Sequence, residues 1–398
     1  GTVAIDSTGV TTIAAAGDIV AGGVVTFGAA KSGTLTTSAD VTTTNDNITF
    51  TRAVTLGAGV AFDTGGGTAG NILFSAAIAT AANTLTLDAG TAGNITLSGA
   101  LTGRGAMTVT DGAVQAYAAL TVGSLSIVDA TTSVTFNGAI DASTTITVVS
   151  GGTIVQTGAV TTATTVDYDA GSTIALNAGI TASGTVAIDS TGVTTIAAAG
   201  NIIAGGAVTF GVAKSGVLTT SGDVDTTDDN ITFTRAVTLG GAVDIDTVGG
   251  SAGNIVFSAA IATGGNALAL DAGTAGNITL SAALTGGGAM TVRDGAVQAY
   301  GALTVGSLSI ADATTSVTFG AGVAATGTIT VTSGGTIVQT GAVTGVTNVD
   351  YDAGSTILIS AGITASGTVA IDSTGITTMA TAGDIIAGGV VTFGAAKA

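Results

Sequence analysis

The chain has 398 residues and a formal net charge of -18, with seven basic residues against 25 acidic ones, all of them aspartate. So few basic residues speak against nucleic-acid binding, because a phosphate backbone is bound through a basic surface. The absence of cysteine excludes a disulfide framework and thiolate metal sites. The sequence has no uninterrupted stretch of 18 apolar residues, so it does not predict a membrane-spanning helix.

The order of residues is that of a tandem array. Residues 1–183 are followed without insertion or deletion by a second copy, residues 184–366, in which 145 of 183 positions are identical. Residues 367–398 begin a third copy. A copy without gaps indicates a structural period, because one inserted residue would break the register of whatever stacks on it. Neither end carries an atypical capping repeat, so we expect a segment of a longer polypeptide.

A shorter rhythm runs through each copy. Strand signals led by Asn47, Asn71 and Asn94 lie 24 and 23 residues apart, and a second series falls between them at residues 60–62, 85–87 and 107–109. Each triplet reads apolar, polar or small, apolar, which is typical of a strand with one buried face. Two strand signals per coil of about 23 residues, and about eight coils per 183 residues, predict an all-β parallel β-helix, or β-solenoid, with almost no helix.

Stacked coils place like residues above one another. We therefore expect interior ladders of phenylalanine and isoleucine, an outward threonine ladder and an asparagine ladder at one corner. We also expect the three basic residues of the first copy outside, and equivalent surroundings for residues 183 apart. The residues concerned are Phe27, Phe50 and Phe74; Ile48, Ile72 and Ile95; Thr26, Thr49 and Thr96; Asn47, Asn71 and Asn94, repeated as Asn230, Asn254 and Asn277; and Lys31, Arg52 and Arg104.

One motif carries a resemblance. The sequence Ala-Gly-Asn-Ile-Thr-Leu at residues 92–97 recurs at residues 275–280, with a variant at residues 69–74. It resembles the repeats of bacterial filamentous-haemagglutinin-type adhesins and of related giant repetitive surface proteins. That resemblance implies a right-handed parallel β-helix, export to the cell surface, and a role in adhesion or in an extracellular fibre.

Two groups of aspartates are candidate sites. Asp167 and Asp169, repeated as Asp350 and Asp352, place two carboxylates on one strand face, a spacing that could serve sugar chemistry. We interpret them as a solvated face, because the pair recurs unchanged in each copy and the chain has no histidine. Four aspartates in one turn of the second copy could supply the hard oxygen ligands that calcium prefers, which makes this turn a weak candidate for a calcium site. Its residues are Asp223, Asp225, Asp228 and Asp229.

The leading hypothesis is a structural, non-enzymatic, extracellular protein of the cell surface, which forms a long fibre, filament or adhesin stalk. The alternatives are a β-helical polysaccharide lyase or hydrolase and a self-assembling sheath or surface-layer component. Only 8% of the residues are charged, so we expect apolar surface to remain outside. That surface predicts lateral or end-to-end self-association, or contact with cell-envelope or host glycans.

Overall fold

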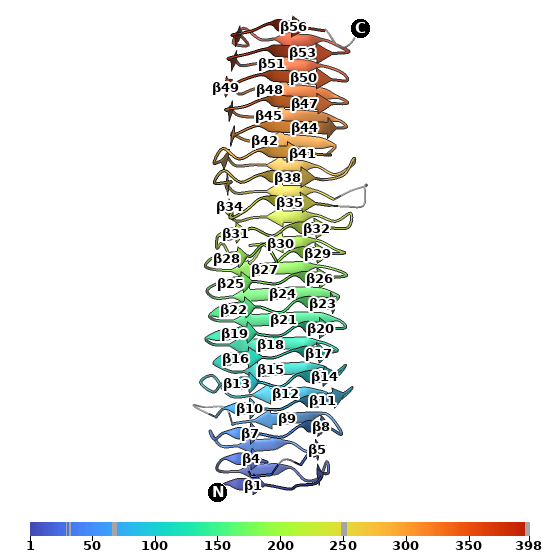
Figure 1. Cartoon of the computed structure of the whole chain (residues 1–398), viewed down its shortest axis with the longest axis vertical. Coiled ribbons are helices and arrows are strands. Elements are labelled where there is room, and N and C mark those ends of the chain that lie inside the picture. Colours follow the sequence, from blue (N-terminus) through green and yellow to red (C-terminus); the bar gives the residue numbers. More distant parts are fainter. Residues whose placement is uncertain (29, 32, 66–69, 248–252, 395–398) are drawn as a thin grey trace. The chain divides into compact units, whose positions relative to one another are not determined.

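The computed structural model describes residues 1–28, 30–31, 33–65, 70–247 and 253–394. The chain forms two compact units, Gly1–Thr195 and Ile196–Ala398. Each is an all-β parallel β-solenoid, and together they have about 19 turns of about 20 residues (Figure 1). The described residues contain no helix. The predicted fold class is confirmed, and Ala69, the first residue of the variant motif, lies outside the described residues.

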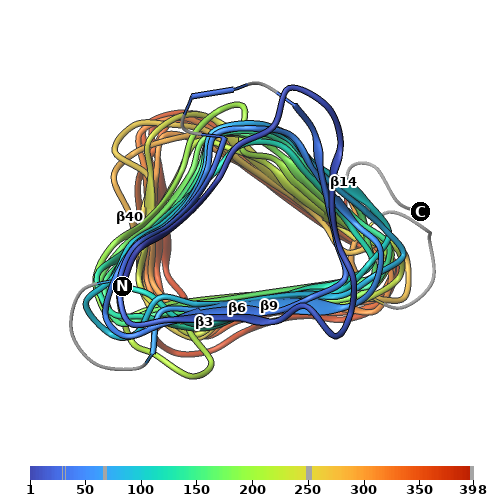
Figure 2. The ribbon, with the colours of Figure 1, turned by 90° about the horizontal axis from the view of Figure 1, so that it is seen from below.

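Every turn has three strands, and each inner strand of a unit pairs in parallel with the third strand before it and the third after it. The turns of the first unit, blue to green in Figure 2, therefore trace a triangle with one sheet on each side. The two strand series expected from the sequence are two of these sides. The third side was missed, although its strands such as β8 (Val54–Leu56) have the same alternating pattern.

We name the three sheets of each unit after the side chains that point outward from their strands. In the first unit the apolar face consists of β1 (Val3–Ile5), β4 (Val25–Phe27), β7 (Ile48–Phe50), β10 (Ile72–Phe74), β13 (Ile95–Leu97), β16 (Val114–Tyr117), β19 (Ser133–Phe136), β22 (Thr153–Gln156) and β25 (Ile174–Leu176). The threonine face consists of β2 (Thr11–Ile13), β5 (Leu35–Thr37), β8, β11 (Ile78–Ala81), β14 (Leu101–Gly103), β17 (Leu120–Val122), β20 (Ile140–Ala142), β23 (Val160–Ala163) and β26 (Ile180–Ala182). The aspartate face consists of β3 (Ile19–Ala21), β6 (Val41–Thr43), β9 (Val60–Asp63), β12 (Leu85–Asp88), β15 (Met107–Asp111), β18 (Leu125–Ala130), β21 (Thr145–Ser150), β24 (Thr165–Ala170) and β27 (Val186–Ser190).

The second unit has the same three faces, and β28 (Thr194–Ile196) covers the boundary in the sequence. Its apolar face consists of β30 (Val208–Phe210), β33 (Ile231–Phe233), β36 (Ile255–Phe257), β39 (Ile278–Leu280), β42 (Val297–Tyr300), β45 (Ser316–Phe319), β48 (Thr336–Gln339), β51 (Ile357–Ile359) and β54 (Thr377–Met379). Its threonine face consists of β31 (Leu218–Thr220), β34 (Val237–Leu239), β37 (Ile261–Ala262), β40 (Leu284–Thr285), β43 (Leu303–Val305), β46 (Val323–Ala325), β49 (Val343–Val346), β52 (Ile363–Ala365) and β55 (Ile385–Ala387). Its aspartate face consists of β29 (Ile202–Ala204), β32 (Val224–Thr226), β35 (Val243–Asp246), β38 (Leu268–Asp271), β41 (Met290–Val292), β44 (Leu308–Ala313), β47 (Ile329–Ser333), β50 (Val349–Ala353), β53 (Val369–Ser373) and β56 (Val391–Phe393).

The sequence copy does not contain a whole number of three-strand turns. One copy contains 26 strands, β1 to β26, and 26 is not a multiple of three. Within the first unit β1 therefore lies on the apolar face and its copy β27 on the aspartate face. Within the second unit β30 and its copy β56 are related in the same way. The expectation that residues 183 apart share their surroundings therefore holds for β4 to β26, whose copies β30 to β52 lie on the same-named faces and repeat contacts such as the hydrogen bond between Asn71 and Asn47. It fails for β1 and for β30.

Turn length also varies along a copy. Ile48 is paired with Val25 and with Ile72, 23 and 24 residues away, as the rhythm of the sequence predicts. Further on, Val134 is paired with Gln115 and Ile154, only 19 and 20 residues away. The later turns are shorter because their strands follow one another through corners of few residues.

The interior is built from the predicted ladders. Phe27 and Phe50 stack with ring centroids 4.7 Å apart, and Phe50 and Phe74 with centroids 4.3 Å apart. These rings and Ile48, Ile72 and Ile95 are completely buried, as expected. Stacked aromatic rings add to the stability that burial of apolar area gives.

The asparagine ladder is confirmed through its hydrogen bonds. Asn71 donates its backbone N–H to Oδ1 of Asn47 over 2.8 Å, and Asn94 donates to Oδ1 of Asn71 over 2.9 Å. Neither they nor their copies are among the described residues with a left-handed backbone, which include Asn45 at φ 60°. The amide hydrogen bond between turns, and not backbone conformation, therefore explains asparagine at this corner.

Arg52 was expected outside and is buried, with 3% of the residue exposed. Its Nη2 donates to the carbonyl of Ile5 over 3.0 Å, its Nη1 donates to Oγ1 of Thr11 over 3.1 Å, and the Asp6 carboxylate lies 3.7 Å away. Gly28, at φ 83°, leaves room for it, because a Cβ there would stand 2.7 Å from Arg52 Nε. Lys31 and Arg104 are exposed, as predicted.

Candidate functional site

The charged residues of the strands gather on one side of each unit. In the second unit all strand aspartates lie on the aspartate face, and in the first unit all but Asp141 do so. The strands of both apolar faces contain no charged residue. The strand aspartates of the two aspartate faces are Asp63, Asp88, Asp111, Asp129, Asp167, Asp169 and Asp189 in the first unit, and Asp225, Asp244, Asp246, Asp271, Asp312, Asp350, Asp352 and Asp372 in the second.

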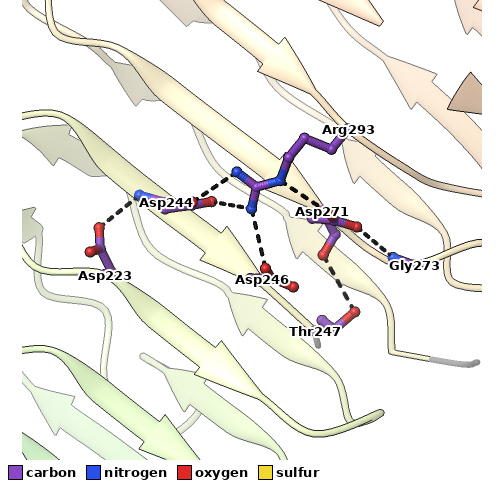
Figure 3. A network of polar contacts seen from close by, with 7 residues as sticks. All are labelled: Asp223, Asp244, Asp246, Thr247, Asp271, Gly273 and Arg293. Carbon is purple, nitrogen blue, oxygen red and sulfur yellow. Dashed lines mark hydrogen bonds and ion pairs between the residues drawn. The ribbon is translucent and has the colours of Figure 1, made fainter. Parts of the chain in front are cut away.

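An arginine lies at the centre of the densest group of these carboxylates (Figure 3). Nη1 and Nη2 of Arg293 each donate over 2.8 Å to one carboxylate oxygen of Asp244, two turns away. Nη2 also reaches Asp246 at 3.2 Å, and Nε donates to Asp271 in the intervening turn over 3.0 Å. The guanidinium therefore joins three successive turns, with the bidentate geometry that gives arginine pairs their strength.

Too many carboxylates meet here for one guanidinium to balance. Partial burial raises the pKa of Asp225 to about 6, and repulsion from Asp246, Asp223 and Asp244 adds to the effect. Burial and the neighbouring Asp271 also raise the pKa of Asp246. The hydrogen bonds from Arg293 to Asp244 raise the pKa of the guanidinium, so it stays charged. The group is therefore an acidic patch of surface with the guanidinium of Arg293 at its centre.

The structure divides the four residues of the calcium candidate between two places. Asp225 is paired in the sheet with Asp246, and Asp223 accepts a 2.8 Å hydrogen bond from the backbone N–H of Asp244. Asp228, at φ 58°, and Asp229 lie in the corner that follows β32. In the part of the chain that the structure describes, no group of three or more acidic side chains is arranged to hold a metal ion.

The two copies differ at this group in a concerted way. The first copy has Thr110, Ala61 and Thr42 where the second has Arg293, Asp244 and Asp225. The cation and two of the anions are therefore present together in one copy and absent together from the other. Residues that contact one another directly are expected to differ together between the two copies.

On the threonine face of the first unit, the first copy has an ion pair that the second copy lacks. Arg104 donates to both carboxylate oxygens of Asp141 over 3.1 and 2.9 Å, and Asp141 also accepts a hydrogen bond from Thr162. The hydrogen bond from Thr162, helped by Arg104, lowers the pKa of Asp141. In the second copy all three residues are replaced, by Gly287, Ala324 and Gly345.

The paired carboxylates considered for sugar chemistry lie as predicted on one side of β24. Asp167 is exposed, Asp169 is half-buried, and Tyr168 between them is completely buried. Burial raises the pKa of Asp167, and repulsion from Asp169 and Asp189 acts in the same direction. The arrangement is a row of carboxylates on an open sheet.

Sequence reasoning missed a buried polar pair. Nε2 of Gln115 donates to the carbonyl of Asp129 over 3.0 Å, and the hydroxyl of Tyr117 donates to Oε1 of Gln115 over 2.7 Å. Both side chains are completely buried, and burial raises the pKa of Tyr117 well above its usual value. The signal was the sequence Val-Gln-Ala-Tyr, present in both copies, in which polar side chains occupy inward positions.

The fold and its surfaces define the class of protein as a parallel β-solenoid in which each unit has one acidic and two nearly charge-free sides. Comparisons with family models, with curated proteins and with solved structures find no match. Within the described residues there is no helix of the length and apolar character that crossing a membrane requires.

Proposed function

We propose that the chain is a structural element of a long extracellular surface fibre or adhesin stalk and not an enzyme. The observation that carries this proposal is the backbone hydrogen bonding between successive turns. In each unit the three sheets bond every inner turn to the turn before it and the turn after it. A protein built in this way gains length simply by adding turns, because no turn needs a partner beyond its neighbours.

The side chains support the same role. The aromatic and asparagine ladders repeat one contact from turn to turn, and both arginine groups on the surface join turns that are not adjacent in the stack. Such contacts resist separation of the turns along the axis, which is the direction in which a stalk is pulled. The copies keep these ladders while their surface residues change, a pattern that suits a load-bearing scaffold.

The location and role are tested on the cells that make the protein. Antibodies raised against the purified chain, labelled with gold, should mark filaments at the cell surface in electron micrographs. Label confined to the cell interior, or label on cells without filaments, would contradict the proposal. Cleavage of a panel of acidic and neutral polysaccharides by the purified chain would instead favour the lyase or hydrolase alternative.

A further inference from the structure

We propose that the apolar face of the second unit is the surface through which the chain binds a second copy of itself. This inference deepens the proposed fibre role and rests on it. It names the side of the solenoid that makes the contact, and the partner that fits it.

The outward residues of this face are apolar or carry a methyl group. In the second unit five of the nine central outward residues are threonine and the other four are valine, alanine and leucine. Val297 and Leu358 are 41% and 36% exposed. A continuous uncharged surface of this kind is typical of a protein contact. In the second unit the outward residues are Thr209, Thr232, Val256, Thr279, Ala299, Thr318, Val338, Leu358 and Thr378.

Charge selects the partner. The chain carries a formal charge of -18, so two copies repel one another wherever their carboxylates approach. The strand carboxylates lie on the aspartate face, which leaves the apolar face as a side by which two copies can meet without opposing rows of like charge. A basic partner would be drawn to the aspartate face instead. A second copy, in contrast, presents an uncharged surface with the same spacing between strands.

The differences between the copies follow the same division. From β4 to β25, the strands of the apolar face differ from their copies at only three positions, and each exchange is apolar for apolar. One of them replaces Ala175 with Leu358, which enlarges the outward apolar surface. New strand charges appear only on the aspartate face, at Asp225 and Asp244.

The size of the face in one unit predicts a weak contact. Nine strands about 4.8 Å apart, each presenting about 10–12 Å of width, offer about 450 Å² per molecule in one unit. That is about 900 Å² in total, below the roughly 1,200–2,000 Å² of a stable interface. Small residues Ala299, Gly301 and Gly320 form a shallow hollow of about 390 Å³ in this face, which a side chain of the partner can enter.

The test uses the full chain and two matched double variants. Val338→Lys with Leu358→Lys places two cations on β48 and β51 of the apolar face, and Thr344→Lys with Thr364→Lys places two on β49 and β52 of the threonine face. Sedimentation velocity from low to tens of micromolar chain measures association, and circular dichroism checks that all three proteins are folded. We expect the first variant to weaken self-association by about tenfold or more, with the second close to the unchanged chain.

Three results would overturn the inference. They are a monomeric unchanged chain at tens of micromolar, equal association of the unchanged chain and the apolar-face variant, and equal loss in both variants. If the apolar-face variant does not fold, Val338→Gln with Leu358→Gln takes its place with the same expectation. A monomeric chain that still labels surface filaments would remove the contact and leave the fibre role standing.

Discussion

Arg293 and Asp244 form a bidentate ion pair across two turns of the solenoid, with both contacts at 2.8 Å. The residues aligned with them in the first copy are Thr110 and Ala61, so the first copy lacks both members of the pair. We expect an arginine or an aspartate alone at this place to be unfavourable. The surrounding carboxylates make this understandable, since Arg293 is the cation that also contacts Asp246 and Asp271.

The first prediction is an energetic coupling in this pair. Arg293→Thr should lower the free energy of unfolding because it leaves Asp244, Asp246 and Asp271 facing one another without a cation. Adding Asp244→Ala should recover part of the loss. Both side chains are 39% exposed, so screening by water limits the coupling to about 0.5–1 kcal/mol. Urea unfolding of the four proteins of the cycle measures it, and strictly additive effects would contradict the contact.

The second prediction concerns pH. The pKa of Asp225 is raised to about 6 in the fold, against about 3.9 in an unfolded chain. The folded state therefore binds the proton more tightly, and the free energy of unfolding should fall as pH rises from about 4 through 6. Asp225→Thr, which restores the residue of the first copy, should reduce this dependence. Urea midpoints at pH 5 and pH 7 that differ equally in both proteins would show that Asp225 is not responsible.

The third prediction separates the two sides of one strand. Ile72→Asp places a charge without a partner in the core and should cost several kcal/mol of stability. Leu73→Asp, one residue further along β10, places the same charge on the outward side and should cost much less. Thermal unfolding followed by circular dichroism measures both. Equal losses would mean that the register of β10 is off by one residue.

How far the sequence predicts this structure depends on the distance between partners. The alternating triplets predict the strands, and their spacing predicts the stacking of Phe27 on Phe50. The burial of Arg52 was not predicted, because its partners Ile5 and Thr11 lie 47 and 41 residues away, and only two turns of the solenoid bring them together. The group around Arg293 was missed for the same reason, although the paired differences between the copies carried the signal.

The fourth prediction follows from the buried arginine. Arg52→Leu leaves the carbonyl of Ile5 and the carboxylate of Asp6 without their cation, and should lower the free energy of unfolding by about 2–4 kcal/mol. Arg104→Leu removes an exposed guanidinium and should cost less than about 1 kcal/mol. Unfolding in urea compares the two. A larger loss for Arg104→Leu would contradict the burial of Arg52.

The most direct test of the three-sided solenoid uses the absence of cysteine from the chain. Thr36 and Thr55 are paired on neighbouring strands of the threonine face, the side that sequence patterns did not reveal, and adjacent strands stand about 4.8 Å apart, within the range of a disulfide. The double variant Thr36→Cys with Thr55→Cys should form an intramolecular disulfide on mild oxidation, measured by mass spectrometry. Thr36→Cys with Thr49→Cys, whose second cysteine lies on the apolar face, should not. Closure of the control pair, or failure of the first pair to close, would contradict the stacking of three strands per turn.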